Sequence, residues 1–244
     1  MDNKFIIIVP VYNAAEYING CLDSIISQEY NNYEICVIDD CSTDGTWEKI
    51  LDIQNKCGAR MNICRNEYRI ESSLVNIMKM IELFALNSND IIVEVDGDDQ
   101  LYDNGVLSYL NGVYQDKNTY MTYGTFIPLS GTYGPYGYYI PNTRTYRKER
   151  LWYASHLRTF KKSLWSLIRH EDMRDGSGNY YGRAWDAAIM YPMIEMCGHK
   201  HLKFIERIMY IYNDINPLND MKTDKTLQIA IGEEIQDKPC YNEL

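Results

Sequence analysis

The alternation of hydrophobic and polar positions predicts strands and helices in regular succession over the first half of the chain. Short apolar runs rich in β-branched residues are typical of buried strands. Four such runs are present, at 5–9, 34–38, 61–64 and 91–95. Between them, apolar residues recur three and four positions apart, which is the spacing of one helix face. We therefore expect helices that begin after Asn13, around Trp47 and after Ser72. The succession predicts an α/β fold with a mostly parallel sheet flanked by helices.

The pattern changes after about residue 118. Residues 120–146 contain seven tyrosines, four glycines and three prolines, and we expect irregular strands and loops that lie over the site. A helix is expected over 183–197, with a kink or a late start because of Pro192. Residues 203–212 predict a returning strand, and the residues after 220 predict a loosely docked tail.

Composition narrows the classes of protein to consider. The chain has 244 residues, is 45% hydrophobic and carries a formal net charge of −10, so a large core is expected and a nucleic-acid partner is not. The seven cysteines include no C-x-x-C pair, which favours reduced thiols in the cytoplasm. The apolar run FIIIVPV is broken by Pro10 and is too short for a transmembrane segment. Oligomeric state is left open.

Acidic and polar residues follow three of the predicted strands. The strand ends read VPVYN, IDDCSTDG and VDGDD, and ligands of parallel α/β sheets bind beyond the carboxyl ends of the strands. Asp96, Asp98 and Asp99 repel one another unless a cation lies among them. A D-x-D turn points two carboxylates the same way, and carboxylate oxygens are ligands of Mg²⁺ and Mn²⁺. The alternative is a solvated acidic turn.

These motifs resemble those of a known enzyme family. The segment VPVYNAAEYINGCLDSIISQEYNNYEICVIDDCSTDGT, followed by VEVDGDD, is similar to the opening of family 2 glycosyltransferases, which have the GT-A fold. The resemblance covers residues 4–110 closely and 180–213 more loosely. It implies a single GT-A domain, with an acceptor-side part at its C-terminal end. The implied parts are a nucleotide-sugar-binding half at 1–118, an acceptor-binding and catalytic half at 119–220 and a tail at 221–244.

The resemblance implies a nucleotide site on the first two strand ends. A carboxylate is a strong acceptor for the imide N–H of a base, and Asp39 lies at a strand end beside the loop at 10–12. The alternative is that Asp39 and Asp40 cap the following turn. Arg69 could supply the diphosphate contact that family members place in the next helix. The expected nucleotide-binding residues are Pro10, Val11, Tyr12, Asn13, Asp39, Arg69, Asp96 and Gly97.

The same resemblance implies a cation site with Mn²⁺ or Mg²⁺. Asp98 is expected to be the main ligand, Asp96 to contact both ribose and metal, and Asp99 to support them. His199 or His201 could add a third ligand, although surface histidines are the simpler interpretation.

The family also places an acidic residue at the start of a helix, commonly as Glu-Asp. Here Trp185 takes the Glu position, so Asp186 is the implied general base. The alternative is an aspartate that favours the helix dipole.

Two further segments have open interpretations. His156 and Arg158, in HLRTFKK, could contact the diphosphate or an anionic acceptor, or could belong to an amphipathic helix with snorkelling side chains. The tyrosines of 120–146 could form an acceptor platform or pack in an edge lobe.

The predicted function is a metal-dependent inverting glycosyltransferase that moves a sugar from a nucleotide-diphosphate donor to an acceptor hydroxyl group, with a glycan as the expected acceptor. A UDP-sugar is favoured because Asp39 suits an imide N–H. One alternative is a non-catalytic module that binds sugar nucleotides or glycans. A nucleotidyltransferase is a weaker alternative, because VPVYNAAEY lacks the Gly-rich, Arg- or Lys-bearing loop that grips a triphosphate.

Overall fold

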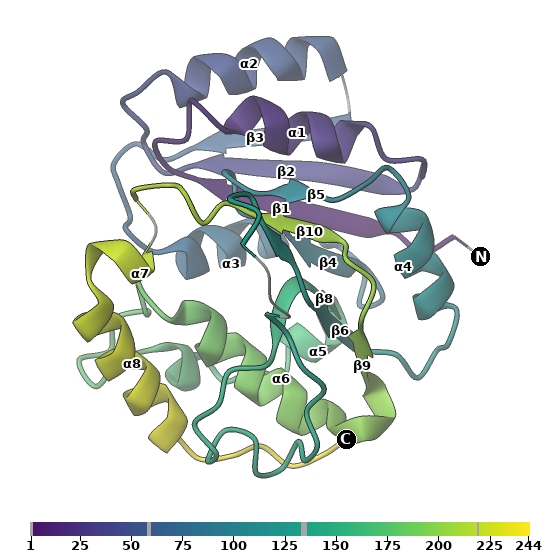
Figure 1. Ribbon diagram of the computed structural model, residues 1–244, viewed down its shortest axis with the longest axis vertical. Helices are drawn as coiled ribbons and strands as arrows, with labels where there is room; N and C mark the ends of the chain where they lie inside the picture. Colours follow the sequence, from purple (N-terminus) through teal and green to yellow (C-terminus); the bar gives the residue numbers. More distant parts are fainter. Residues whose placement is uncertain (1, 58–59, 133–135, 219) are drawn as a thin grey trace.

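A sheet of seven strands, in the order β3-β2-β1-β4-β8-β6-β9, forms the centre of the protein. The computed structural model describes residues 2–57, 60–132, 136–218 and 220–244 (Figure 1). The four strands predicted in the first half are confirmed, and they run parallel to one another. Their bounds are β1 (Phe5–Val11), β2 (Tyr33–Asp39), β3 (Met61–Arg65) and β4 (Ile91–Glu94).

The other half of the sheet mixes strand directions. Strand β8 (Ser155–Lys161) is antiparallel to both of its neighbours, β4 and β6 (Met121–Gly124), while β9 (Leu202–Ile205) is parallel to β6. Every residue of β8 is buried, so the interpretation of HLRTFKK as an amphipathic helix is wrong. The backbone pairs with strands on both sides instead, and Lys161 donates to the carbonyl of Lys117 over 3.0 Å.

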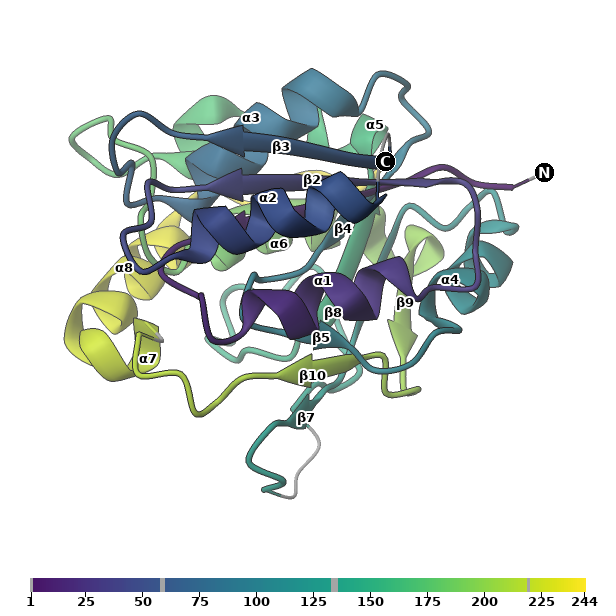
Figure 2. The ribbon, with the colours of Figure 1, turned by 90° about the horizontal axis from the view of Figure 1, so that it is seen from above.

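Helices cover both faces of this sheet (Figures 1 and 2). The face that carries Ile7 and Val93 packs against α1 (Ile18–Ile26), α2 (Thr46–Cys57) and α4 (Val106–Tyr114). The face that carries Ile92 and Phe160 packs against α3 (Ser73–Phe84) and α6 (Trp185–His201). Two apolar cores separated by a mostly parallel sheet confirm the predicted fold class.

The helix starts agree only in part with the sequence. Ser72 caps α3 as predicted, because its hydroxyl accepts from the amide of Val75. In contrast, α1 begins at Ile18, since Asn13 has a φ of 47° and lies in a loop. Helix α6 continues through Pro192, and its non-helical residue is Gly198. The irregularity in α6 therefore lies at Gly198 and not at Pro192, where we expected it.

The predicted strand at 203–212 is two strands in different sheets. Residues Leu202–Ile205 form β9, and β10 (Tyr210–Tyr212) lies between β5 (Gln100–Leu101) and β7 (Ile127–Pro128) in a small second sheet. This small sheet brings the end of β10 close to the turn after β4, where β5 begins.

The chain after residue 161 forms mainly helices around α6. They are α5 (Lys162–Trp165), the 3₁₀ turn η2 (His170–Met173), α7 (Asp220–Thr223) and α8 (Lys225–Asp237). The end of the chain is docked more firmly than expected, because Ile235 is buried and the amide of Leu244 donates to the Met196 carbonyl over 2.9 Å. A buried ion pair of 2.7 Å joins Arg147 to Glu195 of α6. Of the helices in the described ranges, none combines the length and the apolar character needed to cross a membrane.

Candidate functional site

A cavity of about 780 Å³ lies at the carboxyl ends of β1 and β4. Parallel sheets bind ligands at this edge, and the antiparallel strand β8 brings its own first residues to the same place. Most of the predicted site residues line the cavity, namely Pro10, Val11, Tyr12, Arg69, Asp96, Gly97, Asp98, Asp99, His156, Arg158 and Asp186. The fold therefore brings together groups that are up to 176 positions apart in the chain, from Pro10 to Asp186.

The turn at 96–99 is held tightly against the end of β1. The amide of Gly97 donates to the Pro10 carbonyl over 3.1 Å. A Cβ atom at Gly97 would lie 2.6 Å from the Cβ of Val11, so glycine is required for the backbones to come this close. The amide of Asp96 donates to the Tyr210 hydroxyl over 3.1 Å. These contacts fix where the three carboxylates of the turn can lie.

Two asparagines from the loop after β10 bind this turn. Asn216 donates from its side chain to Asp98 Oδ2 over 2.6 Å, and the backbone amide of Asn213 donates to Asp99 Oδ1 over 2.7 Å. Sequence reasoning missed both residues. The sequence feature that could have identified them is a pair of asparagines, three positions apart, directly after the predicted strand at 203–212.

Burial and mutual repulsion perturb the acidic groups of the turn. Burial raises the pKa of Asp98. The pKa of Asp99 lies well above its usual range because of burial and then the charges of Asp98 and Asp96. On β8, burial and the neighbouring Arg158 hold the pKa of His156 well below its usual range. A bound cation would offset the free-energy cost of burying charged carboxylates so close to one another.

The donor groups in this place fit a divalent cation. Asp96, Asp99 and His156 each offer a ligand atom, and these atoms lie within 4.8 Å of one another. Asp99 Oδ2 and His156 Nδ1 are buried and have no hydrogen-bond partner among the described residues. Carboxylate oxygens suit Mg²⁺ and Mn²⁺, and an imidazole nitrogen suits the transition metal better. This group contains Asp96 but not Asp98 of the two predicted metal ligands. It also contains His156, which we expected to contact the diphosphate or the acceptor.

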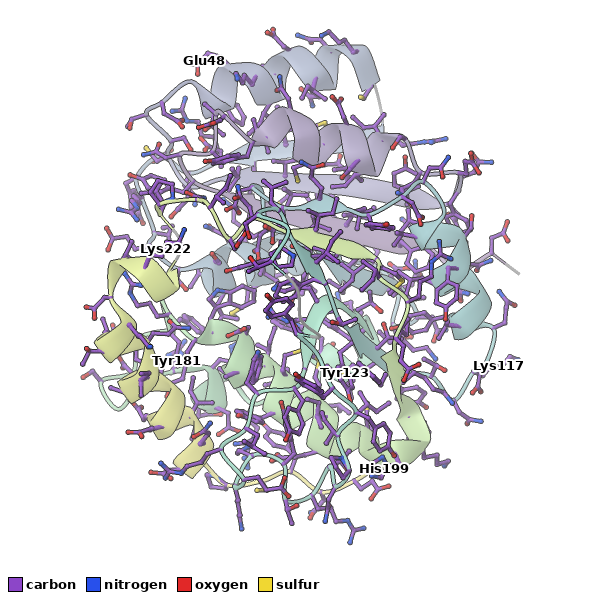
Figure 3. The ribbon with its side chains drawn as sticks, in the orientation of Figure 1. Glu48, Lys117, Tyr123, Tyr181, His199 and Lys222 are labelled. Atoms are coloured by element: carbon purple, nitrogen blue, oxygen red, sulfur yellow. The ribbon has the colours of Figure 1, made fainter. Side chains whose placement is uncertain are left out.

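The histidines considered as third ligands lie elsewhere. His199, at the far end of α6 (Figure 3), is near Pro141 and Tyr139, with 3.1 Å between Nε2 and the Pro141 carbonyl. His201 Nδ1 is 2.6 Å from the carbonyl of Asn118. Neither is among the described residues that line the cavity.

The predicted nucleotide residues divide into lining and supporting groups. The guanidinium of Arg69 lies 3.9 Å from the ring centroid of Tyr12, and both residues line the cavity. Asp39 is fully buried and does not appear among the described lining residues. Its carboxylate accepts from the amide and hydroxyl of Ser42 and pairs with Arg65 Nε over 3.1 Å. Burial raises the pKa of Asp39.

The residues next to Asp39 fix the loops around it. Asp40 lines the cavity and accepts from the amides of Ile70 and Glu71 over 2.9 and 3.0 Å, which holds the loop that carries Arg69. Asn13 accepts from the Thr43 amide over 2.8 Å. Like Asp39, Asn13 is not among the described lining residues.

A charged chain runs from β4 to the start of α6. Glu94 lies directly opposite Arg158 in the β4–β8 pair, and Arg158 Nη2 is 2.9 Å from Asp186 Oδ2. Glu94 is buried, and neither of its oxygens has a hydrogen-bond partner among the described residues. Burial, partly offset by Arg158, raises the pKa of Glu94 to about 8. From the sequence, we treated Glu94 only as part of an apolar strand. A single carboxylate within such a run could have indicated a buried charged partner.

Two of the five described non-glycine residues with positive φ line the cavity. Non-glycine residues with positive φ include Asn13 at 47°, Glu71 at 62° and Ala184 at 46°. Glu71 and Ala184 line the cavity, and Ala184 immediately precedes α6 and so sets the position of Asp186. Such conformations cost free energy and are concentrated at functional sites.

The tyrosine-rich segment contributes residues both to the core and to the cavity lining, and its role as an acceptor platform stays a prediction. Tyr123 and Tyr146 are buried in the core, whereas Tyr136 lines the cavity and stacks on Phe126 with 4.5 Å between ring centroids. Tyr133 lies outside the described residues. The cavity is also lined by a second set of residues, which comprises Trp152, Trp185, Tyr191, Gln228, Ile229, Gly232 and Gln236.

Comparison with known proteins relates the chain to glycosyltransferases. The sequence profile described as Glycosyl transferase family 2 matches residues 6–175. The chondroitin synthase of Pasteurella multocida (strain Pm70) is 26% identical over 221 residues, which are 90% of this chain and 22% of that protein. TarS of Staphylococcus aureus, a poly(ribitol-phosphate) beta-N-acetylglucosaminyltransferase, is 38% identical over 61 residues, 24% of this chain and 11% of that protein. The chain thus spans less than a quarter of the length of these two relatives.

Two solved structures share the fold. Staphylococcus aureus TarS 1–349 in complex with UDP-GlcNAc superposes with a TM-score of 0.69 at 17% identity, over 91% of this chain and 61% of that chain. The mannosyltransferase PcManGT from Pyrobaculum calidifontis, in complex with GDP-Man and Mn²⁺, has a TM-score of 0.60 at 18% identity, over 86% of this chain and 57% of that chain.

Proposed function

The chain belongs to glycosyltransferase family 2, and on that premise we propose that it transfers a sugar from a UDP-sugar to a hydroxyl group of a glycan. The observation that carries this proposal is a single cavity that contains both the acidic turn at 96–99 and Asp186. The turn suits a nucleotide diphosphate with its cation, and Asp186 suits the removal of a proton from an acceptor. An enzyme that joins the two substrates needs both.

The nucleotide end of the cavity supports a uridine donor. Tyr12 offers a ring for the base, and Arg69 beside it offers positive charge for the diphosphate. Asp39 is the proposed acceptor for the imide N–H. One oxygen of the Asp39 carboxylate must then give up its present contact with Ser42 or Arg65. The TarS structure that shares the fold holds UDP-GlcNAc, whereas PcManGT holds GDP-Man. We favour uracil because it presents an imide N–H to a carboxylate.

A divalent cation fits the acidic turn: Asp96, Asp99 and His156 would hold it through ligand atoms that lie within 4.8 Å of one another, and Asp98, which also lines the cavity, would add a further carboxylate. When bound, it supplies positive charge that stabilises the departing diphosphate. The protein's own part is to hold the turn in place through Gly97, Asn213 and Asn216.

Asp186 is the proposed general base. It lies in the first turn of α6 with 24% of its side chain exposed, and Arg158 fixes the direction of its carboxylate. The proton of the acceptor hydroxyl passes to this carboxylate as the oxygen attacks the anomeric carbon and the bond to the diphosphate breaks. Glu94 is not among the described lining residues, and the carboxylates of the turn at 96–99 are assigned to the cation, so the proposed mechanism uses Asp186 alone and has no covalent intermediate. A single displacement inverts the anomeric configuration.

Nucleotide binding tests the donor half of this proposal. The free energy of unfolding of the parent should rise by roughly 2.7 kcal/mol with UDP at about 100-fold excess over its Kd, and only with Mn²⁺ present. Asp98→Asn should lose this metal-dependent gain, whereas Asp116→Asn, on a partly exposed residue paired with Lys203, should keep it. Full retention in Asp98→Asn, or tighter binding of GDP than of UDP by calorimetry, would contradict the assignment.

Donor turnover separates an enzyme from a binding module. A catalytic site should hydrolyse a UDP-sugar slowly in the presence of Mn²⁺ when no acceptor is added, because water takes the place of the acceptor hydroxyl. Binding without any release of UDP over hours would favour the non-catalytic alternative.

A further inference from the structure

One face of α8 forms part of the cavity wall. Gln228, Gly232 and Gln236 line the cavity, and residues four positions apart lie on the same side of a helix. This face therefore presents two amide side chains with a glycine between them. Gln228 Oε1 accepts from the Ala184 backbone amide over 3.0 Å, and Gln236 Nε2 donates to the Tyr191 hydroxyl over 3.1 Å. Both amides are thus held in place by neighbouring residues of the wall.

Trp152 provides a flat surface in the same wall. It lines the cavity and remains 37% exposed. Its ring meets that of Tyr191 edge-on, with 5.6 Å between centroids, so Tyr191 contacts both Trp152 and Gln236. An aromatic ring of this kind attracts the slightly positive C–H groups on one face of a pyranose.

This surface is next to the proposed base. The guanidinium of Arg158 lies 5.9 Å from the centroid of Trp152 and also pairs with Asp186 over 2.9 Å. A sugar ring that stacks on Trp152 would therefore have its hydroxyl groups close to the Asp186 carboxylate.

The charges around α8 indicate what kind of sugar fits. Its acidic residues are engaged away from the lining face, because Glu234 accepts from the Tyr181 hydroxyl, and Glu233 and Asp237 pair with Arg150. The α8 residues that line the cavity carry no charge. Amide groups can exchange hydrogen bonds with sugar hydroxyls in both directions, but they offer no cation for a carboxylate or a phosphate. Of the arginines that line the cavity, Arg158 pairs with Asp186 and Arg183 donates to the Thr223 hydroxyl.

We propose that α8 and Trp152 form the acceptor subsite and that it binds an uncharged pyranose ring. This inference rests on the proposed function, because it assigns the second substrate of the same reaction.

Gly232 allows the subsite to be filled without disturbing the fold. A Cβ atom at this position meets nothing within 4 Å, and alanine is favoured over glycine within a helix. Gly232→Phe should project its ring into the cavity, whereas Gly232→Ala should leave most of the space. Gly112 in α4 is a matched control, since its Cβ would also meet nothing within 4 Å and it is not among the described lining residues.

Saturation-transfer NMR with simple glycosides measures occupation of the subsite directly. The probes are the methyl β-pyranosides of glucose, galactose, N-acetylglucosamine, N-acetylgalactosamine and glucuronic acid, with UDP and Mn²⁺ present. At least one neutral glycoside should show saturation transfer with the parent. Gly232→Phe should weaken its binding by about tenfold or more, equivalent to about 1.4 kcal/mol. Gly232→Ala and Gly112→Phe should retain binding, and all variants should keep the UDP-dependent stabilisation.

Three results would overturn this inference: unchanged glycoside binding in Gly232→Phe, binding of the glucuronide alone, or no binding of any neutral glycoside to the parent. Failure of UDP to stabilise the parent would instead count against the proposed donor site, so the two proposals can fail separately.

Discussion

Replacing Glu94 by glutamine should make the stability of the protein less dependent on pH. Burial raises the pKa of Glu94 from 4.5 to about 8, so the folded protein keeps a proton that the unfolded chain releases. The stability that comes from this proton is fully present below pH 4.5 and is lost as the pH rises through about 8. The shift is 8 − 4.5, or about 3.5 pH units. At about 1.4 kcal/mol per unit, the total change is on the order of 5 kcal/mol.

The assay is urea unfolding of the parent and of Glu94→Gln between pH 4 and pH 9, with EDTA present to remove bound cations. Glutamine resembles the protonated acid but does not titrate. The free energy of unfolding of the variant, relative to the parent, should therefore rise across this range and level off above about pH 8. Any cost of burying the amide is the same at every pH, so it shifts the difference without changing its slope.

Glu94→Met serves as a second variant, because it lacks both the carboxyl and the amide. It should show the same change of slope from a different starting value. Parent and variant curves that run parallel from pH 5 to pH 8 would refute the reasoning, because Glu94 would then lose its proton at the same pH in the folded and unfolded states.

Three other substitutions test the base, a buried ion pair and a helix cap. Asp186→Asn should lower kcat for sugar transfer by roughly 10²–10⁴ while the Kd for UDP stays the same; a near-parent kcat, or an NMR spectrum with the donor's anomeric configuration retained in the product, would contradict its role. Arg147→Met leaves Glu195 buried without its partner, so urea unfolding should show a loss of about 3–5 kcal/mol. The exposed control Arg150→Met should lose less than about 1 kcal/mol, and equal losses would contradict the comparison. Ser72→Ala should cost about 1 kcal/mol in the same assay, and no change would argue against the cap.

Local patterns were sufficient for the four parallel strands of the first half of the fold and for the start of α3. The strand at 91–94 and the cap at Ser72 depend on residues within a few positions of one another, so their signals are present in short windows of sequence. The strand-end motifs also predicted correctly that Tyr12 and Asp98 would line one cavity, because parallel strands end at a common edge.

Long-range pairing accounts for what the sequence did not show. The charges of β8 suggested either a contact with an anionic substrate or an amphipathic helix, but Arg158 is balanced by Asp186, which is 28 positions away in the sequence. Asn216 contacts Asp98 across 118 positions, and the small second sheet that makes this contact possible has strands of two or three residues. Hydrophobic periodicity carries too little information to predict strands this short.

The pairing of β4 with β8 limits how this part of the gene can change in length. Glu94 is opposite Arg158 and Ile92 is opposite Phe160, and side chains alternate between the two faces of a strand. Deletion of one residue between 158 and 160 would move Arg158 and Phe160 to opposite faces of the sheet. Insertions and deletions in homologous chains should therefore fall in the irregular segment before Ser155 and avoid the strand itself. Sequence alignments of such chains would show this as a block of constant length preceded by gaps.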